Sequence, residues 1–199
     1  MKQRFDTRAA AQWLLENAVI LDAETTGLDE NARIMEIAII DGQSGRQLQN
    51  NLVECHREPD PEAFALHGIT STMTLACGIT VQQLDELLDI VALNENKWIT
   101  SFNLPFEYRM IIQTIYNNAD PIEPFQQYEQ GQPLCIMELA NRHLHQHLEW
   151  DFEQSKFKRL SLARCCEIAG VEFTGQAHRA LPDAIAARDL LVAIAEGRA

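Results

Sequence analysis

The 199-residue sequence is poor in positive charge. It contains 16 Lys and Arg residues against 29 Asp and Glu residues, which gives a formal net charge of −13. A chain this acidic argues against a protein that coats nucleic acid by bulk electrostatic attraction. It leaves open an enzyme that contacts a few nucleotides beside bound cations, because those cations would neutralise part of the acidity.

Long apolar runs and paired cysteines are also missing. No apolar stretch approaches the length that a bilayer requires. The first residues are typical of an amphipathic helix rather than a signal peptide, so we expect no membrane partner. The five cysteines show no CxxC spacing, and they are Cys55, Cys77, Cys135, Cys165 and Cys166. This pattern predicts reduced thiols, a cytoplasmic location and no zinc site.

The length and the hydrophobic fraction of 46% predict one globular domain over residues 1–199. Apolar runs predict strands at 19–22, 33–41, 46–54 and 98–102, with a hairpin turn between the second and third. Helical spacing predicts helices at 6–17, 59–67, 80–91, 105–116, 135–147, 161–169 and 182–196. Residues 117–133 hold three of the seven prolines and predict a loop or lid. This order is that of a mixed α/β protein.

Acidic residues stand at the ends of predicted elements. Asp22 and Glu24 end an apolar strand, and because side chains alternate along a strand they point the same way. Two carboxylates without a neighbouring cation repel each other unless a metal ion or a proton intervenes. Asp183 lies in the first turn of the last helix, and His178 lies just before it. Oxygen ligands of this kind suit Mg²⁺ or Mn²⁺ better than zinc.

Taken one at a time these residues have ordinary explanations. Asp22 and Glu24 could be a solvated turn, Asp183 a helix-start acid that favours the helix dipole, and His178 a surface histidine. The sequence around them is more informative than the residues alone. It contains Asp22-Ala-Glu24-Thr-Thr-Gly-Leu28 near the beginning and His178-Arg-Ala-Leu-Pro-Asp183-Ala near the end.

These two segments resemble the first and third motifs of the DEDDh 3′–5′ exonucleases, the superfamily of proofreading exonucleases and ribonuclease T. Three shorter segments between them also resemble the family, namely Ile34-Met-Glu-Ile-Ala38, Pro61-Glu-Ala-Phe-Ala-Leu-His67-Gly-Ile-Thr70 and Ser101-Phe-Asn103-Leu-Pro-Phe106-Glu107. The similarity extends over nearly the whole chain, and it is most like that of bacterial exonuclease X-type proteins. It implies a ribonuclease H-like α/β fold whose mixed five-stranded sheet has one antiparallel strand and flanking helices. We place the fifth strand at 134–136.

The resemblance also implies a catalytic set. Asp22, Glu24, Glu107 and Asp183 would hold two Mg²⁺ or Mn²⁺ ions, and His178 would be the general base. The 3′-terminal nucleotide would be bound by Thr25, Thr26, Gly27, Leu28, His67, Asn103 and Phe106. The chain departs from the family at Glu107, where an aspartate is expected. The extra methylene displaces the carboxylate by roughly 1–1.5 Å unless the backbone compensates.

We therefore predict a metal-dependent 3′–5′ exonuclease that releases nucleoside 5′-monophosphates, with single-stranded DNA as the favoured substrate. Two alternatives stay open, an exoribonuclease acting on short RNA and a weakly active or non-catalytic accessory protein. The substitution at Glu107 is the only support for the second. The sequence does not decide between a homodimer and an accessory-protein partner.

Other patterns are weaker. His143, His145 and His147 invite a metal interpretation, but a solvated helix end fits them better. Arg109 could contact a substrate phosphate, although a surface arginine is the simpler interpretation, and Glu36 fits a structural role. Residues 149–159 interleave Trp and Phe with Lys and Arg, a pattern that can bind single-stranded nucleic acid or simply pack under a loop.

Overall fold

The computed structural model describes residues 6–94, 97–116 and 135–198. Its centre is a sheet of four strands in the order β3-β2-β1-β4. They are β1 (Ala18–Thr25), β2 (Ile34–Asp41), β3 (Gln47–Leu52) and β4 (Trp98–Thr100). β2 is antiparallel to both β1 and β3, whereas β4 is parallel to β1. The predicted mixed sheet with one antiparallel strand is thus confirmed.

The predicted fifth strand is wrong for the residues that the structure describes. Cys135 forms a single parallel bridge with Ser101, and helix α6 begins at the next residue. The chain cannot extend the ladder there because Cys135 is already the residue that precedes the first turn of this helix. Leu134 and the whole of the predicted 117–133 loop lie outside the described residues.

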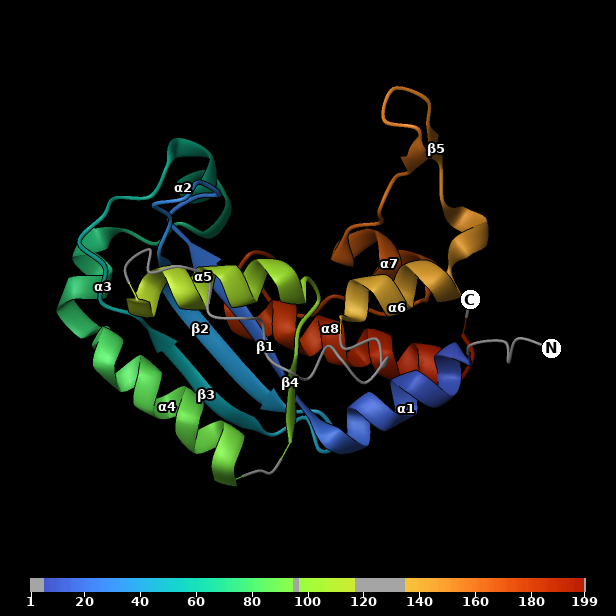
Figure 1. The fold of residues 1–199 in the computed structure, drawn as a ribbon, viewed down its shortest axis with the longest axis horizontal. Helices are drawn as coiled ribbons and strands as arrows, with labels where there is room; N and C mark the ends of the chain where they lie inside the picture. The colour runs from blue at the N-terminus through green and yellow to red at the C-terminus, as the bar shows by residue number, and fades with distance from the viewer. Residues whose placement is uncertain (1–5, 95–96, 117–134, 199) are drawn as a thin grey trace.

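Helices cover both faces of the sheet (Figure 1). One face packs against α1 (Thr7–Asn17), α6 (Ile136–His143), α7 (Leu162–Ile168) and α8 (Ala180–Ala195). The other face packs against α4 (Val81–Asn94) and α5 (Leu104–Tyr116). The short helices α2 (Pro61–His67) and α3 (Ser71–Cys77) lie beside the end of the sheet where β1 finishes. None of the described helices has the length and apolarity needed to cross a membrane.

Alternation along β1 and β2 divides the core into two layers. Ile20 and Ile40 pack into the cluster that contains α1 and α8, whereas Leu21 and Ile39 pack into the cluster that contains α4 and α5. All eight residues of β2 are buried, which is why its sequence is an almost continuous apolar run.

Capping side chains set several helix starts. Asp6 accepts hydrogen bonds from the N–H groups of Arg8 and Ala9 at the start of α1, and Ser161 does the same for Arg164 at the start of α7. The predicted helices differ from the structure at two places in particular. The predicted 135–147 helix breaks at Leu144 into a 3-10 turn, η2 (His145–His147), and helix α3 was not predicted.

Candidate active site

Three carboxylates from opposite ends of the chain meet beside the end of β1. Asp22 and Glu24 share the face of Ile20, which is the face that α8 covers. Asp183 lies in the first turn of α8. Asp22, Glu24 and Asp183 each offer an oxygen, and these oxygens lie within 4.8 Å of one another. The structure thus brings together three of the four carboxylates that the sequence predicts to bind metal.

The start of α8 is fixed by Glu36, which pairs with Glu24 across β1 and β2. The Glu36 carboxylate is 4% exposed. It accepts hydrogen bonds from the Arg179 guanidinium, with Nε 2.9 Å from Oε2, and from the Ala180 N–H at 2.9 Å. This double contact ties the first turn of α8 to β2, and it therefore determines where Asp183 lies relative to β1.

The carboxylate cluster is electrostatically strained without a cation. Burial, followed by the nearby charges of Glu107 and Asp183, raises the pKa of Asp22 well above its usual value. Burial and the charge of Asp183 raise the pKa of Glu24 to about 8. Burial also raises the pKa of Asp183 to about 6, against the opposing effect of His178. Each shift disfavours the charged form, and a bound cation would reverse it.

Glu107 lies deeper than the other acids. It belongs to α5, its side chain is 5% exposed, and burial followed by the charges of Glu24 and Asp183 raises its pKa well above the usual value. It is not among the residues whose oxygens meet within 4.8 Å. The fourth predicted ligand is therefore close enough for its charge to interact with those of Glu24 and Asp183, but it lies outside the three-carboxylate set.

Two carboxylate oxygens, one of Glu107 and one of Asp183, lack a hydrogen-bond partner among the described residues, as expected of a site that binds a cation. Oε2 of Glu107 and Oδ1 of Asp183 are buried and have no hydrogen-bond partner among the described residues. Buried carboxylate oxygens are normally hydrogen-bonded or bound to metal. A set made entirely of carboxylate oxygens suits hard divalent ions such as Mg²⁺ and Mn²⁺.

His178 stands immediately before this cluster. It is exposed and its φ is +60°, in the left-handed region that non-glycine residues seldom adopt. The following residue, Arg179, is held by Glu36. An uncommon backbone conformation beside a fixed residue is typical of a side chain placed for function.

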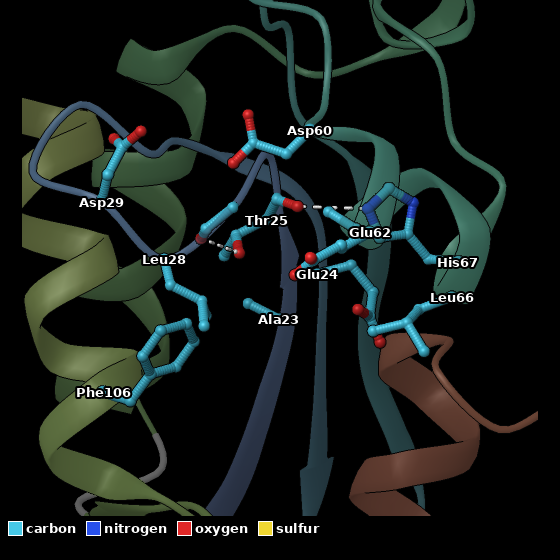
Figure 2. Close-up of a pocket in the computed structure, with 12 residues that line it drawn as sticks. Ala23, Glu24, Thr25, Leu28, Asp29, Asp60, Glu62, Leu66, His67 and Phe106 are labelled. Carbon is cyan, nitrogen blue, oxygen red and sulfur yellow. Dashed lines mark hydrogen bonds between the residues drawn. The ribbon is translucent and has the colours of Figure 1, made fainter.

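A pocket of about 440 Å³ adjoins Glu24 (Figure 2). It is lined by Ala23, Glu24, Thr25, Gly27, Leu28, Asp29, Asp60, Glu62, Ala63, Leu66, His67 and Phe106. Leu28 and Phe106 lie side by side on one side of the pocket, and Glu24 and Glu62 bring carboxylates to the other. Its volume is within the range of small-molecule sites.

Five of the seven predicted substrate-binding residues line this pocket, while Thr26 and Asn103 do not. Thr26 is fully buried, and its N–H and hydroxyl are both bonded to the backbone of Arg33. Asn103 precedes α5, where its carbonyl accepts hydrogen bonds from the N–H groups of Phe106 and Glu107. In this structure both residues shape the elements around the pocket.

His67 holds the pocket loop. Its Nδ1 accepts a hydrogen bond from the Ile69 N–H at 2.9 Å, so the proton lies on Nε2, which donates to the Thr25 carbonyl at 3.1 Å. Burial lowers the pKa of His67, which favours this neutral ring. Across the loop, the Thr25 hydroxyl donates to the Gly27 carbonyl at 2.8 Å. His67 thus contributes to the pocket wall and also orients the end of β1.

Sequence reasoning missed the contribution of α2. Glu62, Ala63 and Leu66 of α2 line the pocket, as does Asp60 just before this helix, and the three helix residues belong to a segment that resembles the family. A Cβ at Gly27 would lie 2.2 Å from Oδ2 of Asp60, so the close approach of these two segments requires glycine.

Arg109 stabilises the other wall. Its guanidinium lies 5.4 Å from the centre of the Phe106 ring, and Nη2 donates to the Leu28 carbonyl at 3.3 Å. This contact joins α5 to the loop after β1. The structure therefore gives Arg109 a positioning contact at the pocket.

Comparison with known sequences identifies relatives along the chain. The family model described as Exonuclease (RNase_T) matches residues 19–191. The uncharacterized exonuclease CP81 of Escherichia phage 186 is 29% identical over 196 residues, which cover 97% of this chain and 95% of the phage protein. The DNA polymerase III subunit epsilon of Salmonella typhimurium is 33% identical over 82 residues, which cover 37% of this chain and 34% of that subunit.

Comparison with solved structures identifies the fold. Escherichia coli exonuclease I in complex with a dT13 oligonucleotide superposes with a TM-score of 0.65 at 17% identity. The superposition covers 92% of this chain but only 41% of exonuclease I. The apo form of exonuclease I gives a TM-score of 0.66 at 18% identity, covering 92% of this chain and 42% of that one. The ribonuclease H-like fold is confirmed, and with the family match over residues 19–191 the chain belongs to the DEDDh-type exonuclease family.

Proposed function

We propose that the protein is a metal-dependent 3′–5′ exonuclease that releases nucleoside 5′-monophosphates from single-stranded DNA. One observation carries the proposal: Asp22, Glu24 and Asp183 meet within 4.8 Å beside a pocket of about 440 Å³. A terminal nucleotide held in the pocket would place its phosphodiester group next to these carboxylates.

Asp22, Glu24 and Asp183 would hold one divalent ion, and Glu107 with Asp22 would support a second. Bound divalent ions activate water and stabilise the charge that develops on the phosphate oxygens. The unpartnered oxygens of Glu107 and Asp183 support this assignment. Because α5 and α8 supply them, both helices must be folded for the site to form.

The remaining residues orient the substrate and move a proton. His178 would accept the proton of the attacking water, since an imidazole nitrogen can serve as a general base and this exposed ring stands just before the helix that carries Asp183. Leu28, which is 72% exposed, and Phe106 would pack against the terminal base. Thr25 and Gly27, which line the pocket at the end of β1, would face the sugar and phosphate.

The choice of single-stranded DNA rests on the related structures. Exonuclease I has been solved with dT13 and dA16 oligonucleotides, which are single strands of DNA. No pocket residue selects between deoxyribose and ribose, so short RNA remains an alternative substrate. The position of Glu107 outside the three-carboxylate set favours a second alternative, a weakly active accessory protein.

A labelled oligonucleotide tests the proposal. A 5′-labelled single strand incubated with Mg²⁺ or Mn²⁺ should give a ladder that shortens from the 3′ end, and a 3′-phosphate should slow the reaction. The Asp22→Asn variant should give no ladder, whereas Asp89→Asn, which removes one exposed carboxylate on α4, should cut as the wild type does. An RNA strand of the same sequence compares the two sugars. Absence of a ladder with either metal would overturn the proposal.

A further inference from the structure

Residues 149–159, whose interleaved aromatic and basic residues predicted either a nucleic-acid contact or packing under a loop, form a small β-hairpin. Its strands β5 (Trp150–Asp151) and β6 (Lys156–Phe157) pair in antiparallel fashion. The pairing continues to the Lys158 N–H, which donates to the Glu149 carbonyl at 2.8 Å. The Asp151 carboxylate closes the turn by accepting two backbone N–H groups at 3.0 Å. We refer to residues 149–159 as the hairpin.

The hairpin exposes three aromatic rings. Phe152 is 86% exposed, Phe157 is 54% exposed and Trp150 is 44% exposed. Trp150 and Phe157 meet edge to face with ring centres 5.0 Å apart. None of the three belongs to a hydrophobic cluster of the described residues. Because exposed aromatic surface is unfavourable in water, a group of this kind marks a binding surface.

The same hairpin carries three cations without a salt bridge among the described residues, although Asp151 lies opposite Lys156 in the strand register. Lys156, Lys158 and Arg159 are exposed, and within the described ranges none of them forms a salt bridge. Arginines elsewhere on the protein are paired with acids, as Arg57, Arg164, Arg179 and Arg188 show. The acids of the hairpin lie on the opposite strand or in the turn, and Asp151 is engaged there by the backbone. Positive charge therefore gathers around Phe157.

The hairpin is placed to reach a strand that leaves the pocket. It projects from the molecule beyond α7, on the same edge as α2, which lines the pocket (Figure 1). We propose that the hairpin binds single-stranded nucleic acid upstream of the 3′ end, with its rings stacking on bases and Lys156, Lys158 and Arg159 contacting phosphates. This inference rests on the proposed function, because it concerns the same substrate strand.

A nucleic-acid strand fits the hairpin better than a protein does. Stacking on bases requires aromatic faces and phosphate binding requires unpaired cations, and here both occur within the ten residues from Trp150 to Arg159. With a net charge of −13 the rest of the protein repels a polyanion, so the few free cations have a large effect on affinity. A second copy of this acidic chain would meet the same repulsion.

Binding of fluorescent oligonucleotides without divalent ions tests the inference separately from cleavage. We would compare strands of about 4 and about 20 nucleotides, because only the longer one can span the pocket and the hairpin. Lys156→Gln/Lys158→Gln should reduce the salt dependence of log Kd by about 1.4 for the long strand and leave the short strand unchanged. Arg46→Gln/Arg164→Gln removes the same charge elsewhere and should not change the slope for either strand.

Trp150→Ala/Phe157→Ala should weaken binding of the long strand about 10-fold or more, with unchanged thermal unfolding because the rings are outside the core. Equal losses for both lengths, no loss, or no binding of the long strand by the wild type would each overturn the inference. The inference would also be overturned if Trp150→Ala/Phe157→Ala bound both strands normally and lost only self-association, measured by sedimentation. Binding through the hairpin without any cleavage ladder would support this inference and contradict the proposed function.

Discussion

The carboxylate cluster makes the stability of the metal-free protein depend on pH. In the folded chain the pKa of Glu24 is raised from 4.5 to about 8, so the folded state binds a proton that the unfolded chain releases. The free energy of unfolding must therefore fall as pH rises through this window. From pH 6 to pH 8, Glu24 alone should reduce it by about 2 kcal/mol.

The neighbouring acids act in the same direction. The pKa of Asp183 is about 6, and the pKa values of Asp22 and Glu107 are also raised. Asp41 acts in a different pH window. Burial tends to raise its pKa, but the hydrogen bonds from Lys97 and Ser44 together outweigh burial and lower the pKa to about 2, so its contribution to stability is lost only in acid. It does not oppose the trend between pH 6 and pH 8.

Thermal unfolding followed by circular dichroism measures this effect. In EDTA the melting temperature should be about 4–8 °C lower at pH 8 than at pH 6 on the Glu24 contribution alone. Mg²⁺ should restore stability more at pH 8, because the ligands must lose their protons to bind it. Glu24→Gln should flatten the dependence, whereas Asp89→Asn should leave it unchanged. A metal-free stability that is constant or rises over this range would refute the reasoning.

Three further predictions concern single contacts. Glu107→Gln should lower cleavage at least about 100-fold. It should also stabilise the metal-free protein at pH 8, since it removes a buried carboxyl group whose charged form burial disfavours. Activity within threefold of the wild type, by initial rates, would remove Glu107 from the mechanism. Arg179→Met leaves the Glu36 carboxylate with only the Ala180 N–H as a partner. It should lower the free energy of unfolding, measured with urea, by about 3 kcal/mol. An unchanged urea midpoint would mean that the ion pair does not hold α8. Gly27→Ala should weaken oligonucleotide binding about 10-fold, and a second substitution, Asp60→Ala, should restore part of it by removing the clashing carboxylate; a single variant that binds normally would show that the loop adapts.

The sheet and most helices could be predicted from sequence because long apolar patterns determine them. The eight buried residues of β2 are an example. The fifth strand could not be, since Leu134 to Ile136 reads as apolar while a helix start at Ile136 ends the pairing after one bridge. The hairpin was missed because β5 and β6 have two residues each, which is too short for any periodicity.

The sequence motifs predicted which carboxylates come together in the candidate site. They did not predict the positions that depend on how helices and loops pack. Asp22, Glu24 and Asp183 meet as predicted. The position of Glu107 outside their set depends on how α5 packs, which the residue type alone does not give. Likewise, no pattern in the sequence shows that the Thr26 hydroxyl accepts a hydrogen bond from the Arg33 N–H and so does not line the pocket, whereas residues of α2 do.

The last described helix completes a site that begins in the first strand. α8 packs against α1, β1 and β2, and it brings Asp183 to Asp22 and Glu24. During synthesis, a chain that has emerged only as far as α7 contains β1 but lacks one side of the metal site. If the proposed chemistry holds, nascent chains and fragments lacking α8 are inert toward nucleic acid, and hydrolysis begins only once α8 has been made and has docked. The fold itself therefore delays the onset of a destructive activity until the protein is assembled.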